Sequence, residues 1–433
     1  MKTKVFLLFA VLCSIIVSCN HEKKETRHHP DWVYDATIYE VNIRQYTQEG
    51  TFTAFTKHIP QLKDLGAGIL WVMPIQPIGV EKRKGTLGSY YSIQNYTQTN
   101  PDFGTLNDFK QLVGAAHDAG MKVILDWVAN HTSHDAVWIT EHKDWYVTDS
   151  LGNVVSPFDW TDVAKLNYNN ADMRKAMQDA MAFWLKETDI DGFRCDVASE
   201  VPADFWESTV TELKKIKPDI FMLAEAEKPE LNVKAFNAYY AWDMHHRMND
   251  IAQGKANVDS LRKTLLKMSS FPDYAIPMIF TSNHDENSWN GTEFERLGAA
   301  ARTFAALTYM LPGMPLIYNG QEIGFNRRLQ FFEKDSIDWS NDPDNFTAFY
   351  QSLIKLKKAN KALFSQELGG KLEEIDTNKP QEIFAFQRKV EDNNVIAIFN
   401  LSPDTVDFTI ENEKFQNLPP QMQLSPWEYK IIN

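Results

Sequence analysis

The chain has 433 residues, a formal net charge of −14, 43% hydrophobic residues and 24% charged residues. This length suffices for a large domain and a smaller one, and the composition is that of an ordinary soluble globular protein. The acidic balance argues against a nucleic-acid partner, because binding a phosphate backbone needs a basic face.

The N-terminus carries the pattern of an export signal. Lys2 and Lys4 precede a mostly apolar run, residues 5–17, which is too short to span a bilayer comfortably. The run ends at Ser18-Cys19, which resembles the lipobox of bacterial lipoproteins. We therefore expect removal of residues 1–18, lipidation of Cys19, a tether over residues 19–32, and a cell-envelope location on the periplasmic face or outer surface. An ordinary secretory signal cut nearby is the alternative. On the lipobox interpretation, the lipid anchor is the chain's only expected contact with a membrane.

From about residue 36, short apolar runs alternate with segments of helical periodicity. The runs predict strands at residues 37–42, 68–73, 121–126, 191–196, 219–225, 275–281 and 314–318, with a further strand, the sixth, somewhere within residues 238–243. Helical periodicity predicts helices near residues 55–65, 105–116, 171–186, 258–268 and 346–356, and another after Pro202. This alternation fits a (β/α)8 barrel better than an open doubly wound sheet. No GxGxxG motif follows the first run, which weighs against a dinucleotide-binding fold.

Two segments depart from this rhythm. Residues 132–166 lack a strong helical period, and so long a connection predicts a short inserted domain after the third strand. Beyond Phe364, strand-like runs at residues 382–388, 395–400 and 406–410 are separated by turn residues. The expected organisation is a barrel over residues 33–364, which includes the insertion, and an antiparallel β domain over residues 365–433.

Acidic and basic side chains gather at the ends of the predicted strands. Barrel enzymes place their chemistry at the C-terminal ends of the strands. A single strand-end acid is often only a helix N-cap, but several repelling carboxylates in one place are costly without a function. The residues in question are Asp126, Asn130, His131, Arg194, Asp196, Glu225, His284 and Asp285.

The run at residues 191–197 contains an arginine and an aspartate on one face. Arg194 and Asp196 alternate with Phe193 and Cys195, so the two charged side chains share one side of the strand. A guanidinium makes a buried carboxylate tolerable, and a fixed, ionised carboxylate can act as a nucleophile. On this stretch alone, a structural ion pair is an equal alternative. We expect Cys195 to be a buried, inert thiol.

The reaction class can be narrowed by motif. Neither a helical HExxH, a tight His/Asp cluster nor a GxSxG nucleophile elbow is present. Glycoside hydrolysis needs a proton donor and a second carboxylate across the scissile bond, which the strand-end acids could supply.

Four segments then resemble, in order, the signature segments of the α-amylase family of glycoside hydrolases. They are residues 126–131 (Asp-Trp-Val-Ala-Asn-His), 192–196 (Gly-Phe-Arg-Cys-Asp), 223–225 (Leu-Ala-Glu) and 281–285 (Thr-Ser-Asn-His-Asp). Further similarity lies at residues 88–93, 100–105, 166–167 and 315–322. The resemblance covers about residues 33–433.

The resemblance implies catalytic roles for four residues. Asp196 would be the nucleophile that forms a covalent glycosyl-enzyme, and Glu225 would be the general acid and then the base. Asp285 would bind hydroxyls of the distorted sugar, and Arg194 would keep Asp196 ionised and oriented. These roles imply retention of the α-configuration.

The resemblance also implies binding roles. His131 and His284 would hydrogen-bond the sugar in the cleavage subsite, and Tyr91 would stack on it. Tyr91 is preferred to Tyr90 by counting back from the Asn-Pro-Asp-Phe-Gly segment. Asp126 is expected among the substrate-binding residues.

Calcium is a possible cofactor, and no organic cofactor is expected. Asn130 matches a calcium ligand of the family, and Asp159 or Asp162 could add oxygen ligands. Ser199 and Glu200 stand where many members carry Lys-His, so one calcium ligand position and one aglycone contact are altered.

The sequence thus predicts a monomeric, retaining α-glucan hydrolase acting on α-1,4 bonds of starch or maltooligosaccharides. One alternative is a cyclomaltodextrinase-like, neopullulanase-like or transglycosylating, trehalose-forming enzyme on the same scaffold. An alternative of another class is a lipoprotein that only captures glucan. Such a protein would be expected to have lost Asp196 or Glu225.

Overall fold

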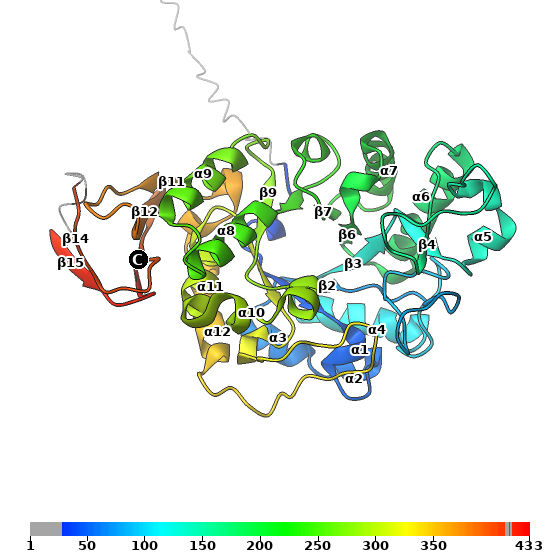
Figure 1. The fold of residues 1–433 in the computed structure, drawn as a ribbon, viewed down its shortest axis with the longest axis horizontal. Coiled ribbons are helices and arrows are strands. Elements are labelled where there is room, and N and C mark those ends of the chain that lie inside the picture. Colours follow the sequence, from blue (N-terminus) through cyan, green and yellow to red (C-terminus); the bar gives the residue numbers. More distant parts are fainter. Residues whose placement is uncertain (1–27, 412–414, 416–417) are drawn as a thin grey trace, which may run out of the picture.

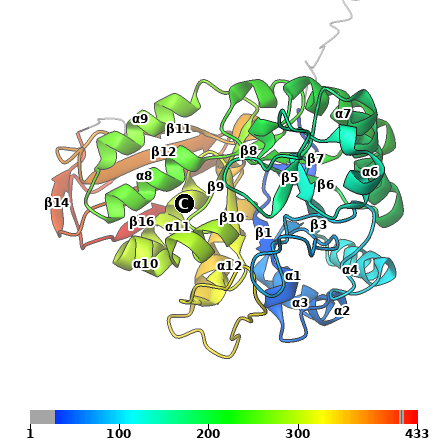
Figure 2. The ribbon, with the colours of Figure 1, turned by 45° about the vertical axis from the view of Figure 1, so that its right-hand side comes forward.

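The computed structural model describes residues 28–411, 415 and 418–433, so the proposed lipidation site at Cys19 lies outside the described residues. Eight parallel strands close into a barrel in the order β1-β2-β3-β6-β7-β8-β9-β10, with β10 pairing β1. They are β1 (Ile38–Val41), β2 (Ile69–Val72), β3 (Lys122–Val128), β6 (Gly192–Asp196), β7 (Phe221–Ala224), β8 (Ala238–Tyr240), β9 (Ile276–Ile279) and β10 (Met314–Tyr318). The predicted (β/α)8 barrel is therefore confirmed (Figures 1 and 2).

The barrel strands are apolar because both of their faces are buried. One set of side chains fills the barrel interior, with Trp71, Ile124, Leu223 and Tyr240 among its members. The alternate set, including Phe193 and Cys195, packs outward against the helices. Arg194, which lies between Phe193 and Cys195, therefore points into the barrel.

Helices cover the outside of the barrel (Figure 2). They are α1 (Ile43–Tyr46), α2 (Phe52–Thr56), α3 (Ile59–Leu65), α4 (Leu106–Asp118), α6 (Ala171–Thr188), α7 (Ala203–Ile216), α8 (Trp242–Ala252), α9 (Val258–Met268), α10 (Glu293–Leu297), α11 (Ala301–Met310) and α12 (Phe346–Ala359). Thr105 caps α4 as expected, forming a reciprocal capping box with Asp108. The sequence gives no expectation for α8, α10 or α11, which complete the outer layer. Within the described residues, no helix is long and apolar enough to cross a membrane.

The insertion after β3 and the C-terminal region lie at opposite ends of the molecule (Figure 1). The insertion holds a two-stranded antiparallel sheet, β4 (His131–Ser133) with β5 (Val163–Lys165), and the short helix α5 (Val137–Glu141). The C-terminal region forms two antiparallel sheets, one in the order β11-β12-β13-β16 and one of β14 with β15. Their strands are β11 (Lys371–Glu374), β12 (Ile383–Val390), β13 (Asn393–Asn400), β14 (Val406–Thr409), β15 (Gln421–Leu424) and β16 (Tyr429–Ile432).

A buried guanidinium of the C-terminal sheet contacts the barrel. Arg388, on β12, is completely buried and donates to the carbonyl oxygens of Gly370, Leu311 and Phe364 at 2.8, 3.0 and 2.6 Å. Leu311 directly follows α11, whose last carbonyls lack partners within the helix. The sheet therefore caps a barrel helix.

Candidate active site

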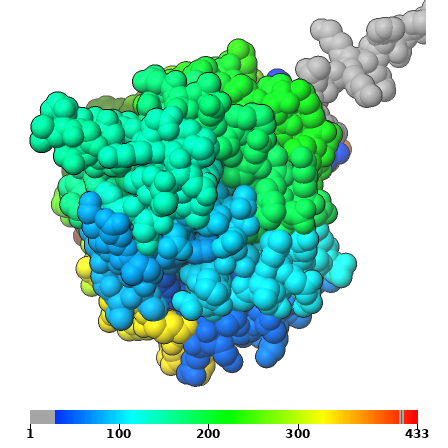
Figure 3. Space-filling view, turned by 90° about the vertical axis from the view of Figure 1, so that its right-hand side faces the viewer, coloured from blue at the N-terminus to red at the C-terminus, as the bar shows by residue number. Residues whose placement is uncertain are grey.

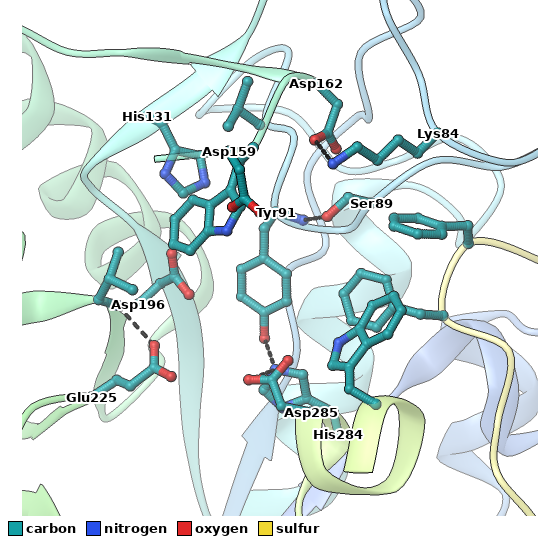
Figure 4. A pocket seen from close by; sticks show the side chains of 16 residues that line it. Lys84, Ser89, Tyr91, His131, Asp159, Asp162, Asp196, Glu225, His284 and Asp285 are labelled. Carbon is teal, nitrogen blue, oxygen red and sulfur yellow. Dashed lines mark hydrogen bonds and ion pairs between the residues drawn. The ribbon is translucent and has the colours of Figure 1, made fainter. Parts of the chain in front are cut away.

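The strand ends deliver the predicted residues to one cavity of about 600 Å³. Asp196 ends β6, Glu225 follows β7, and Asp285 comes soon after β9. Figure 4 shows these three acids around Tyr91, with Asp196 and Glu225 on one side of its ring. The cavity is lined by Lys84, Ser89, Tyr91, His131, Asp159, Trp160, Asp162, Val163, Asp196, Val197, Glu225, His284, Asp285, Trp289, Phe331 and Phe332. Asp126 and Arg194 are fully buried and do not line the cavity.

Arg194 holds three carboxylates at once. Its Nη1 lies 3.0 Å from Asp126 Oδ1 and 3.2 Å from Asp196 Oδ1, and its Nη2 lies 2.8 Å from Glu225 Oε2. Its Nε donates to the Tyr240 hydroxyl at 3.0 Å. The planar guanidinium fork therefore fixes the positions of both proposed catalytic carboxyls relative to each other.

A single guanidinium offsets only part of the cost of burying these acids. Burial, reinforced by the charge of Glu225, raises the pKa of Asp196 well above its ordinary range. Burial also raises the pKa of Glu225, with Arg194 acting against it. Two buried carboxyls on one guanidinium therefore favour a state in which one is ionised and the other carries the proton.

The residue after the proposed nucleophile is in a strained conformation. Val197 has φ 35° and ψ 48°, a left-handed geometry that a β-branched residue rarely adopts. This turn directs the Val197 backbone N–H onto Glu225 Oε2 at 2.8 Å. Among the described residues, the Glu225 carboxyl thus makes its polar contacts through Oε2, which leaves Oε1 to carry the proton.

A chain of hydrogen bonds supports the floor of the cavity. The His284 ring lies 2.5 Å from Glu40 Oε1 through Nδ1 and 2.8 Å from the Tyr91 hydroxyl through Nε2. The Tyr91 hydroxyl donates to Asp126 Oδ2 at 3.0 Å. Burial lowers the pKa of His284, but Asp285 and Glu40 outweigh it and raise that pKa to about 9. His284 is therefore a cation at neutral pH, with Tyr91 fixed between it and Asp126.

His131 is a neutral group by contrast. It is 2% exposed, and burial lowers the pKa of its ring to about 4. The Asn130 side-chain nitrogen lies 3.3 Å from His131 Nδ1. The cavity therefore offers one cationic and one neutral imidazole, His284 and His131.

The residues expected to bind calcium include one carboxylate with a partner of its own. Asp162 is paired with Lys84, with Nζ 2.9 Å from Oδ1. Among the residues that the structure describes, there is no group of three or more His, Cys, Asp or Glu side chains placed to hold a metal ion. Such a group does not include amide or backbone oxygens, so calcium binding at Asn130 stays a prediction.

Several residues of the site escaped the sequence prediction. Glu40, on β1, pairs with His284. Trp71, on β2, donates from Nε1 to Asp126 Oδ2 at 3.1 Å. Glu40 is a strand-end acid like the others and could have been found by that criterion. Lys84 and Phe331 come from loops and Trp289 from a short π-helical turn, Glu286–Asn290, and none of the three leaves a periodic signal in the sequence.

The fold and the site together define a class. Carboxyls at the mouth of a (β/α)8 barrel, one pair on a shared guanidinium and a third beside a cationic histidine, are equipped for acid-assisted attack at an acetal carbon. The protein is a glycoside hydrolase of the barrel type.

The family follows from comparison of the sequence with known proteins. The profile described as "Alpha amylase, catalytic domain" matches residues 30–163 and 143–353, so the chain belongs to the α-amylase family. "Alpha-amylase MalA" of Haloarcula japonica is 26% identical over 87% of this chain, which spans 57% of that relative's length. The "Cyclomaltodextrinase" of a Bacillus species is 25% identical over 86% of this chain and 73% of its own.

Solved structures agree with this assignment. An alpha-amylase from Lactobacillus plantarum superposes with a TM-score of 0.82 at 29% identity, covering 93% of this chain and 99% of that one. A noncanonic maltogenic alpha-amylase from Thermotoga neapolitana superposes with a TM-score of 0.81 at 27% identity, covering 92% and 96%. The similarity therefore extends over the barrel and the C-terminal sheets together.

Proposed function

We propose that the protein is a retaining α-glucan hydrolase that cleaves α-1,4-glucosidic bonds of starch or maltooligosaccharides through a covalent glycosyl-enzyme. The observation that carries the proposal is the attachment of Asp196 and Glu225 to one guanidinium, in a cavity that Asp285 and Tyr91 also line. Relatives named as alpha-amylase and cyclomaltodextrinase support an α-glucan as the substrate.

The first step uses the proton that the buried pair shares. A glucosyl unit stacks on Tyr91, and Glu225 Oε1 delivers its proton to the glycosidic oxygen as the bond to the anomeric carbon breaks. Asp196 Oδ2 attacks that carbon, while Oδ1 stays on Arg194. Asp285 and the His284 cation bind the sugar hydroxyls. The negative charge of Asp285 also stabilises the positive charge that develops on the sugar ring in the transition state.

The second step reverses the proton transfer. Glu225 is now ionised, and its Oε1 takes a proton from the incoming water, whose oxygen attacks the anomeric carbon. The bond to Asp196 breaks, and the carboxylate returns to the Arg194 fork. Two displacements restore the α-configuration.

The test is turnover of defined substrates. Maltoheptaose and soluble starch should both be shortened at pH 5–8, and proton NMR during the first minutes should show α-anomers as the initial products. Unchanged substrate throughout this range would rule the proposal out and favour a glucan-capturing protein. Products of transfer to a second acceptor sugar would favour the transglycosylating alternative.

Location, assembly and metal content are further proposals. The lipobox at Ser18-Cys19 supports a lipid-anchored envelope protein, which radiolabelled palmitate incorporation should test, with Cys19→Ser as the unlabelled control. Size-exclusion chromatography with light scattering tests the proposed monomer. A fall in melting temperature after chelation, reversed by calcium, would support a calcium site near Asn130.

A further inference from the structure

One wall of the cavity is a loop that contacts the insertion on one side and the loop after β10 on the other. The strap, defined as residues 79–89 between β2 and α4, contacts the insertion on one side. The Val80 N–H donates to Asp135 Oδ2 at 2.8 Å, and Lys84 Nζ pairs with Asp162 Oδ1 at 2.9 Å. A Cβ on Gly79 would lie 2.1 Å from Ser133 Cβ, so only glycine allows this approach.

The other side of the strap is attached to the loop after β10. Leu87 N–H donates to the Phe332 carbonyl at 3.0 Å, and Thr86 N–H donates to Glu333 Oε1 at 2.9 Å. Gly85 has φ +62°, and a Cβ there would lie 2.5 Å from Phe332 Cβ. The insertion, the strap and the loop around residues 325–337 therefore form a continuous rim, and Figure 3 shows them as neighbours on one face of the molecule.

The chemistry of the site says which end of a glucan meets this rim. Glu225 protonates the leaving group, so the reducing part of the chain lies on the Glu225 side. The non-reducing part continues from the opposite edge of the sugar on Tyr91. Lys84 and Ser89 of the strap lie across Tyr91 from Asp196 and Glu225 (Figure 4). The rim therefore stands where the non-reducing part of the chain must go.

The rim carries groups suited to a terminal sugar. Lys84 and Asp162 line the cavity as a pair, with side-chain exposures of 38% and 7%. An ammonium has three donors, so Lys84 can hold Asp162 and still donate to sugar hydroxyls. Trp289 is 52% exposed, and its ring centroid lies 5.2 Å from that of Phe331 and 5.7 Å from that of Phe332. The three rings line the same cavity. Aromatic faces of this kind suit the apolar faces of sugars.

We propose that the rim closes the cavity to the non-reducing side, so that the enzyme binds chain ends, and that the Lys84–Asp162 pair contacts the terminal sugar. The inference rests on the proposed glucan hydrolysis and adds its substrate class, which is the non-reducing ends of short α-glucans. An internal glucosyl unit carries a further sugar where a terminal unit carries a free hydroxyl. The ion pair, tied to the strap and the insertion, obstructs that further sugar.

The experiment compares two maltoheptaoses labelled at the reducing end, one of which has its non-reducing sugar blocked with a 4,6-ethylidene group. Wild-type enzyme should shorten the free substrate by one constant step and cleave the blocked one at least about tenfold more slowly. Internal cleavage of both at similar rates would overturn the inference while leaving the hydrolase proposal intact. If neither of them nor starch is cleaved, the hydrolase proposal itself fails.

Variants test the ion pair. Lys84→Met and Asp162→Asn should each raise the ratio of blocked to free cleavage at least about tenfold. Lys110→Met is the matched control, because Lys110 pairs with Glu187 at 2.9 Å with 39% exposure on α4, outside the cavity, and its ratio should equal the wild type. Melting curves identify a variant that fails to fold, and the second variant then decides. A wild-type ratio in a folded Lys84→Met or Asp162→Asn variant would overturn the role of the pair.

Discussion

Glu40 and His284 form a buried ion pair, with Glu40 Oε1 2.5 Å from His284 Nδ1, at exposures of 0% and 2%. Glu40 comes from β1 and His284 from the loop after β9, so two elements far apart in the chain meet beneath the cavity. His284 also contacts the hydroxyl of Tyr91, the residue proposed to stack on the sugar. The charge of Glu40 therefore influences Tyr91 through His284, without contact between Glu40 and the substrate.

Glu40→Gln should narrow the pH range of activity from the alkaline side. The pKa of His284 is raised from 6.5 to about 9, so the proton it holds stabilises the fold fully below pH 6.5, and this contribution is lost as the pH rises through 9. Removing the Glu40 charge should move the alkaline limb of kcat/KM down by about one to two pH units. The fall in melting temperature should be largest near pH 6.5 and below, and should shrink as the pH rises towards 9.

Glu293→Gln is the matched control for Glu40→Gln. Glu293 is also buried, and its pKa is raised to about 7, but its partners are Gln321 and Thr281 rather than His284. Its alkaline limb should coincide with that of the wild type. An unshifted limb in a folded Glu40→Gln variant would show that Glu40 does not set the charge of His284.

Asp196→Asn should abolish turnover and preserve binding. The amide keeps the size of the side chain but cannot form the glycosyl ester, so kcat on maltoheptaose should fall by at least about 10⁴-fold. Trp160 and Trp289 line the cavity, so quenching of tryptophan fluorescence by maltoheptaose reports binding independently of turnover. Residual activity within tenfold of the wild type would exclude Asp196 as the nucleophile.

The positions of the strands could be predicted because the barrel buries both faces of each one, which leaves a continuous apolar run in the sequence. Asp126, Asp196 and Asp285 could then be grouped, since parallel strands in a closed barrel end at the same rim. The sixth strand could be placed only somewhere within residues 238–243. The structure confirms a strand there, β8, which stops at Tyr240, and α8 begins at Trp242, with aromatic residues common to both.

The rest of the site depends on contacts that no local pattern encodes. Lys84 belongs to a loop whose path is set by Ser133 and Phe332, both distant in sequence. The sharing of Arg194 among Asp126, Asp196 and Glu225 requires side chains of three different strand ends to converge on one fork. The resemblance implied Arg194 as a partner for Asp196 alone, so its contacts with Asp126 and Glu225 were not foreseen.

Glu225→Gln should show a dependence on the leaving group that Asp196→Asn lacks. The fluoride ion of α-maltosyl fluoride departs without protonation, so with this substrate the first step no longer needs the acid. Its kcat/KM should fall at least about 100-fold less than that of maltoheptaose. Stopped assays with both substrates measure this difference, and equal losses would argue against Glu225 as the proton donor. In Asp196→Asn, formation of the glycosyl-enzyme should fail with either substrate.

Arg388→Met should destabilise the whole protein without changing specificity. The guanidinium is completely buried and contacts backbone carbonyls among the described residues, and burial lowers its pKa to about 9. It donates to the carbonyls of Leu311, Phe364 and Gly370, and its bonds to Leu311 and Gly370 are fully buried. Methionine fills much of the same volume but leaves those carbonyls unpaired.

The expected loss for Arg388→Met is about 3 to 5 kcal/mol of unfolding free energy. Urea denaturation followed by tryptophan fluorescence measures it, and Lys389→Met, the neighbouring and exposed position on β12, serves as the control. At a temperature where the variant is folded, its ratio of blocked to free maltoheptaose cleavage should match the wild type, because Arg388 lies at the far side of the barrel helices from the strap. A loss below about 1 kcal/mol would mean that the sheet docks through its apolar surface alone.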